Sequence, residues 1–152
     1  MNYLRRFVKQ WIDRLSQPNP AFNGLPACPH ASRALYAICT ISDATELAHL
    51  LRCVRLDPWR ILLILVDFPN REEIKQIISV QKEILAGRDL IALVSDSDNP
   101  MKVGGYRTTQ NAYFFVIVQR KSEIEKASAL LKTQGYYKNW SPEQLRWLED
   151  RT

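Results

Sequence analysis

The first 15 residues carry apolar side chains at helical spacing, with basic side chains between them. The apolar positions are Leu4, Phe7, Val8, Trp11, Ile12 and Leu15. Arginine and lysine occupy the other face, at Arg5, Arg6, Lys9 and Arg14. This spacing predicts an amphipathic helix within residues 1–17. Pro18 and Pro20 end the pattern, and a connector rich in proline and glycine is expected over residues 18–33.

From residue 34 onward, apolar runs of strand length alternate with helical patterns. The runs that predict strands cover residues 34–40, 59–66, 89–95 and 112–119. Each predicted helix opens at a polar residue that is followed three positions later by Glu or Gln, a spacing typical of helix starts. These pairs are Asp43 and Glu46, Asn70 and Glu73, Ser122 and Glu125, and Ser141 and Gln144. Gly87 is expected to end the helix that begins after Asn70.

This order of elements predicts an α/β (α+β) fold, with a four-stranded mixed sheet and helices packed on it. The general architecture is expected to be ferredoxin-like or thioredoxin-like. Strand-helix-strand units predict parallel neighbours, whereas the third and fourth strands are free to pair antiparallel across the long segment 96–111. A chain of 152 residues suits a single domain over 1–152, with its α/β core at 34–152.

Charge and cysteine content narrow the class of protein. The net charge is +5, but acidic residues lie between the basic ones all along the chain. No helix-turn-helix, zinc-finger, RNP or KH signature is present. Nucleic-acid binding is therefore disfavoured. The longest strongly apolar run, Ile61 to Val66, is too short to cross a bilayer, so no membrane association is expected. Three cysteines without a C-x-x-C pair, and no signal-peptide pattern over residues 1–15, predict a reduced, cytoplasmic protein.

The segment 25–33 is the first candidate site. Cys28 is followed by proline, as expected where a short helical turn begins, and the free backbone N–H groups of such a turn favour a thiolate with a lowered pKa. The imidazole of His30 lies close to Cys28 in the sequence, and the guanidinium of Arg33 follows one turn later. We therefore expect Cys28 and His30 to be catalytic residues and Arg33 to bind the ligand. The alternative is that Cys28 packs as a small apolar residue. No metal is expected, because Cys28 and His30 supply only two ligands.

The polar segment 96–111 is the second candidate site. Gly104 and Gly105 offer backbone N–H groups, and Arg107 and Thr108 add a guanidinium and a hydroxyl, a set suited to binding a carboxylate or a phosphate. The segment has no phosphate-loop motif, and its acidic start lacks the glycine and the terminal glutamate of a calcium loop. A solvated hairpin loop is the alternative interpretation.

The chain also resembles a small family of bacterial and phage proteins, in which a leading helix that ends in tryptophan runs into a Phe-x-Gly-x-Pro-x-Cys-Pro-Phe-Ala segment. The matching residues are Trp11, Phe22, Gly24, Pro26, Cys28, Pro29 and Ala31. Further along, the similarity includes Gly105, Arg107, Thr108, Asn111, Tyr136, Tyr137 and Trp140. His30 stands where the family has phenylalanine. The resemblance covers most of the chain and implies no particular reaction.

Three functional hypotheses follow, of which the third is the disfavoured one, a nucleic-acid accessory whose affinity would fall steeply with salt. In the first, the protein is a thiol-dependent enzyme or binding protein that acts on a small anionic ligand through Cys28, without a cofactor. In the second, it is a non-catalytic protein-interaction module or assembly partner, of which a homodimer is one form. A reactive thiol with a low pKa distinguishes the first hypothesis from the second, which expects Cys28 to react as an ordinary buried thiol.

Overall fold

The computed structural model describes residues 2–56, 60–68, 70–99, 101–109 and 113–150. The chain divides into two compact units. Unit 1 contains Met1–Ala34, Asp98–Gln110 and Glu125–Thr152, and unit 2 contains Leu35–Ser97 and Asn111–Ile124. A single domain over 1–152 stays a prediction.

Unit 2 is built on a mixed four-stranded sheet of order β1-β2-β6-β3. Its strands are β1 (Tyr36–Ile41), β2 (Ile61–Val66), β3 (Leu90–Ser95) and β6 (Phe115–Arg120). β1 and β2 pair in parallel, whereas β6 lies antiparallel between β2 and β3. The predicted α+β class, the mixed sheet and the antiparallel pairing of the third and fourth predicted strands are confirmed. Trp59 and Ala112, which the sequence places in two of these strands, lie outside the described residues.

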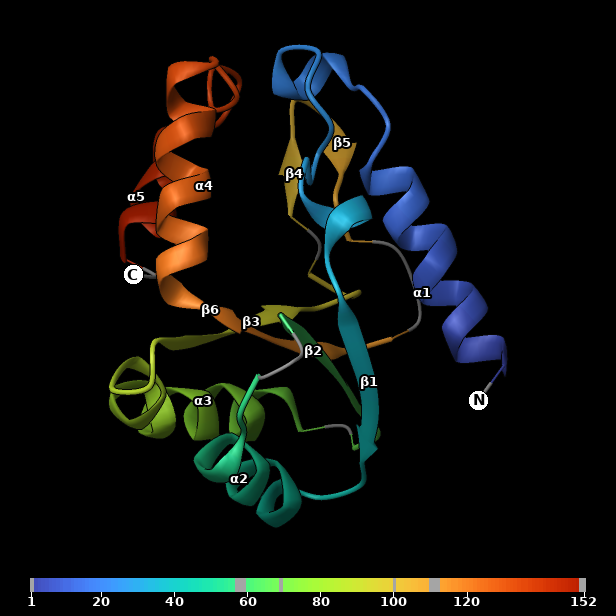
Figure 1. Ribbon diagram of the computed structural model, residues 1–152, viewed down its shortest axis with the longest axis vertical. Helices are drawn as coiled ribbons and strands as arrows, with labels where there is room; N and C mark the ends of the chain where they lie inside the picture. The colour runs from blue at the N-terminus through green and yellow to red at the C-terminus, as the bar shows by residue number, and fades with distance from the viewer. Residues whose placement is uncertain (1, 57–59, 69, 100, 110–112, 151–152) are drawn as a thin grey trace. The chain divides into compact units, whose positions relative to one another are not determined.

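Two helices of unit 2, α2 (Ala44–Cys53) and α3 (Arg71–Ala86), lie side by side on one face of the sheet (Figure 1). Both predicted starts are confirmed. The Oδ1 of Asp43 accepts from the N–H of Glu46 at 2.8 Å, and the Oδ1 of Asn70 accepts from the N–H of Glu73 at 3.1 Å. Aliphatic side chains fill the space between helices and sheet, and those that are fully buried include Leu47, Leu51, Ile64, Ile74, Leu85, Val116 and Val118. Burial of each stabilises the fold by about 1.5–3 kcal/mol.

Arg88 joins the C-terminal ends of α2 and α3. Its Nη1 donates to the carbonyl of Val54 at 2.9 Å, and its Nη2 donates to the carbonyl of Leu51 at 2.8 Å. Its Nε donates to the carbonyl of Ile84 at 3.4 Å. The guanidinium therefore satisfies carbonyl groups that the helix ends leave free. The two helices consequently run in the same direction along the sheet.

The start of helix α4 (Lys121–Thr133) differs from the prediction. The expected cap, Ser122, lies inside the helix, and its backbone N–H and hydroxyl both donate to the carboxylate of Asp89. These hydrogen bonds, with the nearby charges of Arg120 and Lys121, lower the pKa of Asp89. The prediction that Ser122 caps α4 is wrong, because a carboxylate from the turn before β3 satisfies the helix start instead.

Unit 1 is assembled from helices, two 3₁₀ turns and a two-stranded hairpin. They are α1 (Asn2–Leu15), the 3₁₀ turns η1 (Pro20–Phe22) and η2 (Ala31–Arg33), the hairpin strands β4 (Lys102–Val103) and β5 (Tyr106–Arg107), residues 125–133 of α4, and α5 (Pro142–Asp150). The predicted first helix and the predicted last helix are confirmed. Ser141 and Gln144 cap α5 reciprocally, each side chain accepting from the backbone N–H of the other.

The core of unit 1 is aromatic. Phe22 is fully buried, stacks on Tyr136 at 4.9 Å between ring centroids and meets Tyr106 edge-on at 5.9 Å. Tyr137 and Trp140 extend the cluster with an edge-on contact at 4.8 Å. Large rings thus make up most of a core that contains few residues. Over the described ranges of both units, no helix has the length and the apolar content needed to cross a membrane.

Candidate functional site

Cys28 lies in a turn that backbone hydrogen bonds hold in place. Its N–H donates to the carbonyl of Leu15, in the last turn of α1, at 2.9 Å, and its carbonyl accepts from the N–H of Ala31 at 3.1 Å. Burial raises the pKa of the Cys28 thiol, and this effect exceeds the lowering by the backbone N–H groups of His30 and Ala31. The expected lowering of the pKa of Cys28 is therefore wrong.

His30 comes directly before the turn η2 and Arg33 is the last residue of that turn, and both side chains are exposed. His30 occupies the position before the turn, and its side chain makes no capping hydrogen bond. Within the described ranges, no hydrogen bond joins the imidazole of His30 to the sulfur of Cys28. The geometry thus lacks the contact between nucleophile and base that thiol catalysis requires. The catalytic role of Cys28 and His30 stays a prediction.

The described part of the second candidate segment, 101–109, contains a two-stranded hairpin. Val103 pairs with Tyr106 across a turn in which Gly104 and Gly105 have φ of +53° and +81°. A two-residue turn with both central φ values positive follows the twist of a hairpin, and glycine adopts it without strain. The two glycines therefore serve the turn, as the alternative interpretation expects. Residues 100, 110 and 111 lie outside the described residues.

The base of this hairpin is fastened to α1. The backbone N–H and the hydroxyl of Thr108 both donate to the carbonyl of Met101, at 3.1 and 3.2 Å. The carbonyl of Thr108 accepts from the indole of Trp11 at 3.2 Å and from Nη2 of Arg14 at 3.3 Å. Thr108 therefore uses its backbone and its hydroxyl to hold the hairpin, which leaves ligand binding by this residue a prediction.

Arg14 has hydrogen-bonding capacity that the described part of the chain does not use. Its guanidinium lies over the ring of Tyr106, with Cζ 5.6 Å from the ring centroid. Its Nε is buried without a hydrogen-bond partner, and no carboxylate pairs with the guanidinium among the described residues. Buried polar groups are nearly always hydrogen-bonded, because an unpaired one loses its interaction with water and gains nothing.

The two segments predicted from the sequence meet at the last turns of α1. The Cys28 turn binds the carbonyl of Leu15, the hairpin binds Trp11 and Arg14, and η2, which carries Arg33, packs against the same helix. The sequence pattern predicts Arg14 on the polar face of this helix and gives it no special role. Arg14 lies three residues after Trp11, so both side chains are on one side of the helix. This spacing is the sequence signal that could have linked Arg14 to the contact made by Trp11.

Charge is distributed unequally between the units. Unit 1 holds 12 Lys and Arg against 6 Asp and Glu, a net charge of +6. Unit 2 holds 9 against 10, a net charge of −1. The basic character of the chain therefore belongs to the unit that contains both predicted sites. Arg107, in β5, is one of its exposed basic residues.

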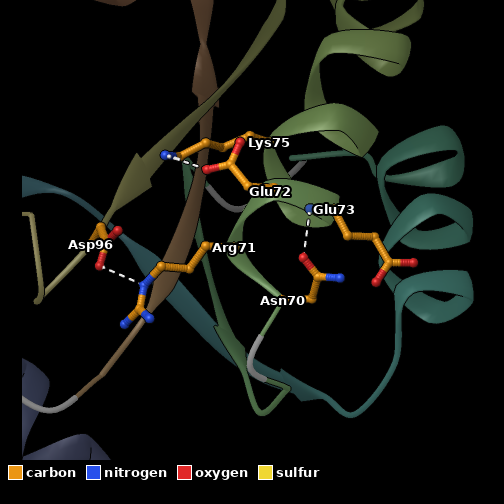
Figure 2. Close-up of polar contacts among 6 residues, drawn as sticks. All are labelled: Asn70, Arg71, Glu72, Glu73, Lys75 and Asp96. Atoms are coloured by element: carbon orange, nitrogen blue, oxygen red, sulfur yellow. Dashed lines mark hydrogen bonds and ion pairs between the residues drawn. The ribbon is translucent and has the colours of Figure 1, made fainter.

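A polar pair that the sequence analysis does not identify lies in unit 2, where β3 ends and α3 begins. The Nε of Arg71 donates to Oδ1 of the buried Asp96 at 3.0 Å, and Figure 2 shows the two side chains pointing toward one another. The guanidinium of Arg71 also lies 5.8 Å from the ring centroid of Phe114. Carboxyl ends of strands often bind ligands. Here the two charges neutralise one another and join α3 to β3, which is a structural role.

A second missed pair is Cys53 and His49 on α2. Their Sγ and Nε2 atoms lie 4.0 Å apart, at the i, i+4 spacing of one helix face, and both residues are exposed. In the part of the chain that the structure describes, no three His, Cys, Asp or Glu side chains form a group that could hold a metal ion.

Comparison with protein-family models, with curated proteins and with solved structures gives no match to this chain. The resemblance to the family with the Cys-Pro segment therefore stays a prediction. The geometry around Arg14 is the observation from which a function can be argued.

Proposed function

We propose that unit 1 is a binding module for a small molecule that carries an oxyanion, either a carboxylate or a phosphate, and that Arg14 is its central contact. The module needs no thiolate. Cys28 contributes to the turn that packs on α1 and is not a nucleophile in this proposal.

The unused Nε of Arg14 carries the proposal. Arg88 in unit 2 is the internal contrast, because its Nε, Nη1 and Nη2 all donate to backbone carbonyls. In Arg14, Nη2 has an acceptor while the buried Nε has none. A guanidinium presents its donors as a planar fork that matches the oxygens of a carboxylate or a phosphate. A bound oxyanion supplies both the missing acceptor and the missing counter-charge.

The surroundings of Arg14 favour an anion over a cation. The net charge of +6 on unit 1 raises the local concentration of anions around it. Arg33 lies on η2, which packs against the same helix, and Arg107 comes directly before the residue whose carbonyl Arg14 binds. Two further arginine-bearing segments, η2 and β5, thus lie next to the helix that carries Arg14.

The test is calorimetric titration of the full chain at low ionic strength with inorganic phosphate and, separately, with acetate. Wild type is expected to bind at least one of the two. Arg14→Gln is expected to weaken that binding about 10-fold or more, since a hydrogen bond to a charged group contributes about 1.5–3 kcal/mol. Near-ultraviolet circular dichroism checks that the fold of the variant is unchanged.

Arg55→Gln is the matched control, because it makes the same charge change at an exposed arginine of unit 2. It is expected to bind as wild type does, and so is Cys28→Ser. Equal weakening in Arg14→Gln and Arg55→Gln would show that only net charge matters and would overturn the assignment of Arg14. Loss of binding in a folded Cys28→Ser variant would restore the thiol-dependent hypothesis.

A further inference from the structure

The outer face of α2 and α3 in unit 2 forms a groove with an apolar middle. Its volume is about 360 Å³, and its lining residues are Ala48, Arg52, Glu73, Gln76, Ile77, Val80 and Gln81. Val80 is 67% exposed, and Ile84, one helical turn further along α3, is 45% exposed. Apolar side chains at this spacing make one stripe along α3, the arrangement by which a helix contacts a neighbour.

The two ends of the groove have opposite charge. Glu73 lies in the first turn of α3, and Arg52 lies in the last turn of α2. Because Arg88 holds the C-terminal ends of both helices together, Arg52 is at the C-terminal end of the groove and Glu73 is at the other end. Figure 2 shows the carboxylate of Glu73 on the side of α3 that faces α2, away from Arg71 and Asp96. Neither Arg52 nor Glu73 has an ion-pair partner in the described ranges.

The groove also contains an unsatisfied polar group. Gln81 is 4% exposed, and its Oε1 has no hydrogen-bond partner among the described residues. A buried amide oxygen in this state lacks the donor that it needs. The side-chain amide of Gln76, exposed on the same helix, is a donor that an identical surface would bring with it.

We propose that a second copy of this chain docks on this groove, as a two-fold symmetric dimer in which the α3 helices of the two copies run antiparallel. A surface with one positive end, one negative end and an apolar middle is complementary to itself after such a rotation. Arg52 of each copy then meets Glu73 of the other, and the stripes that contain Val80 pack together. A two-fold interface uses the same patch twice, which is why self-complementarity points to a second copy.

The test is sedimentation equilibrium of the full chain from micromolar to millimolar concentration. Wild type is expected to dimerise reversibly, and Val80→Glu is expected to weaken the dimer about 10-fold or more, because it places a charge in the apolar centre. Leu130→Glu is the control, since it also replaces an exposed apolar side chain with glutamate, but in unit 1, and it is expected to dimerise as wild type does.

A charge exchange tests the geometry. Arg52→Glu and Glu73→Arg are each expected to weaken the dimer, because each puts like charges opposite one another, and the double variant is expected to restore it. A wild type that stays monomeric throughout would overturn the proposal. So would a dimer that Leu130→Glu disrupts and Val80→Glu does not, or a double variant that is no tighter than the single ones. None of these outcomes bears on oxyanion binding by unit 1.

Discussion

The cores of the two units are built from different kinds of side chain. Unit 2 buries aliphatic side chains between two helices and a four-stranded sheet, and its net charge is −1. Unit 1 draws on three separate stretches of chain, packs them around aromatic rings and carries a net charge of +6. In this chain, the four-stranded sheet and the net positive charge therefore belong to different units.

Arg88 and Arg14 show the same contrast at the level of one residue type. Arg88 is fully engaged in joining two helix ends of unit 2. Arg14 holds a hairpin to a helix in unit 1 and keeps a buried donor unpaired. A structural arginine satisfies its own donors within the fold, whereas a binding arginine leaves one for a ligand.

The largest expected effect is that of emptying the aromatic core of unit 1. Phe22→Ala removes a fully buried ring and is expected to cost about 3–5 kcal/mol. Hydrogen exchange should speed up first in residues 1–34, 98–110 and 125–152, which form unit 1. Ile64→Ala, the matched change in the core of unit 2, should cost about 2–5 kcal/mol and act first on β2 and its neighbours. If hydrogen exchange became faster to the same extent in both units in both variants, the two cores would not be separate.

A smaller effect separates the two arginines. Arg88→Gln is expected to lose about 1–3 kcal/mol of stability in urea denaturation, because the carbonyls of Leu51 and Val54 lose their donors. Arg14→Gln is expected to lose less, since Trp11 still donates to the carbonyl of Thr108. An Arg14 variant that is the less stable of the two would make Arg14 a structural residue.

The three cysteines are expected to differ in their rates of alkylation. Iodoacetamide at neutral pH is expected to label Cys53 first, because it is exposed, and to label Cys28 and Cys39 later, because burial raises the pKa of each. Mass spectrometry of peptides follows the order, with Cys53→Ser as the control for assignment. Labelling of Cys28 before Cys53 would instead indicate a reactive thiolate at Cys28, in unit 1.

The smallest expected effect is a pH dependence in unit 2. The hydrogen bonds from Ser122 lower the pKa of Asp89 below its usual value of 3.8, so the folded state favours the carboxylate. The stability that this provides is present above the unfolded pKa and is lost as pH falls from about 5 through the lowered pKa. Asp89→Asn should flatten this part of the pH profile of urea denaturation, and an unchanged profile would remove Asp89 from the account.

The sequence predicts those features of the structure that depend on residues close together in the chain. Asp43 and Asn70 cap their helices as expected, and Gly104 and Gly105 make the turn that their freedom at positive φ allows. Contacts between distant residues are not encoded in any local pattern. Asp89 reaches Ser122 across 33 positions, and Arg14 reaches Thr108 across 94.

The candidate site shows the same limit. The composition of segment 25–33 predicts a turn around Cys28, and the structure contains one. The pKa of the thiol depends on its burial in the fold, which the composition of the segment does not reveal. For the same reason, nothing in the sequence around Arg14 shows that its Nε lacks an acceptor.

The sharpest test of oxyanion binding at Arg14 follows the nuclear magnetic resonance signals of the arginine Nε–Hε groups during titration with inorganic phosphate and, separately, with acetate. With at least one of the two, the signal of Arg14 is expected to shift and saturate, because its Nε gains an acceptor, while the signal of Arg88 stays in place. An Arg14 signal that moves with neither anion, or one that moves together with the signals of Arg88 and Arg55, would rule out this role of Arg14.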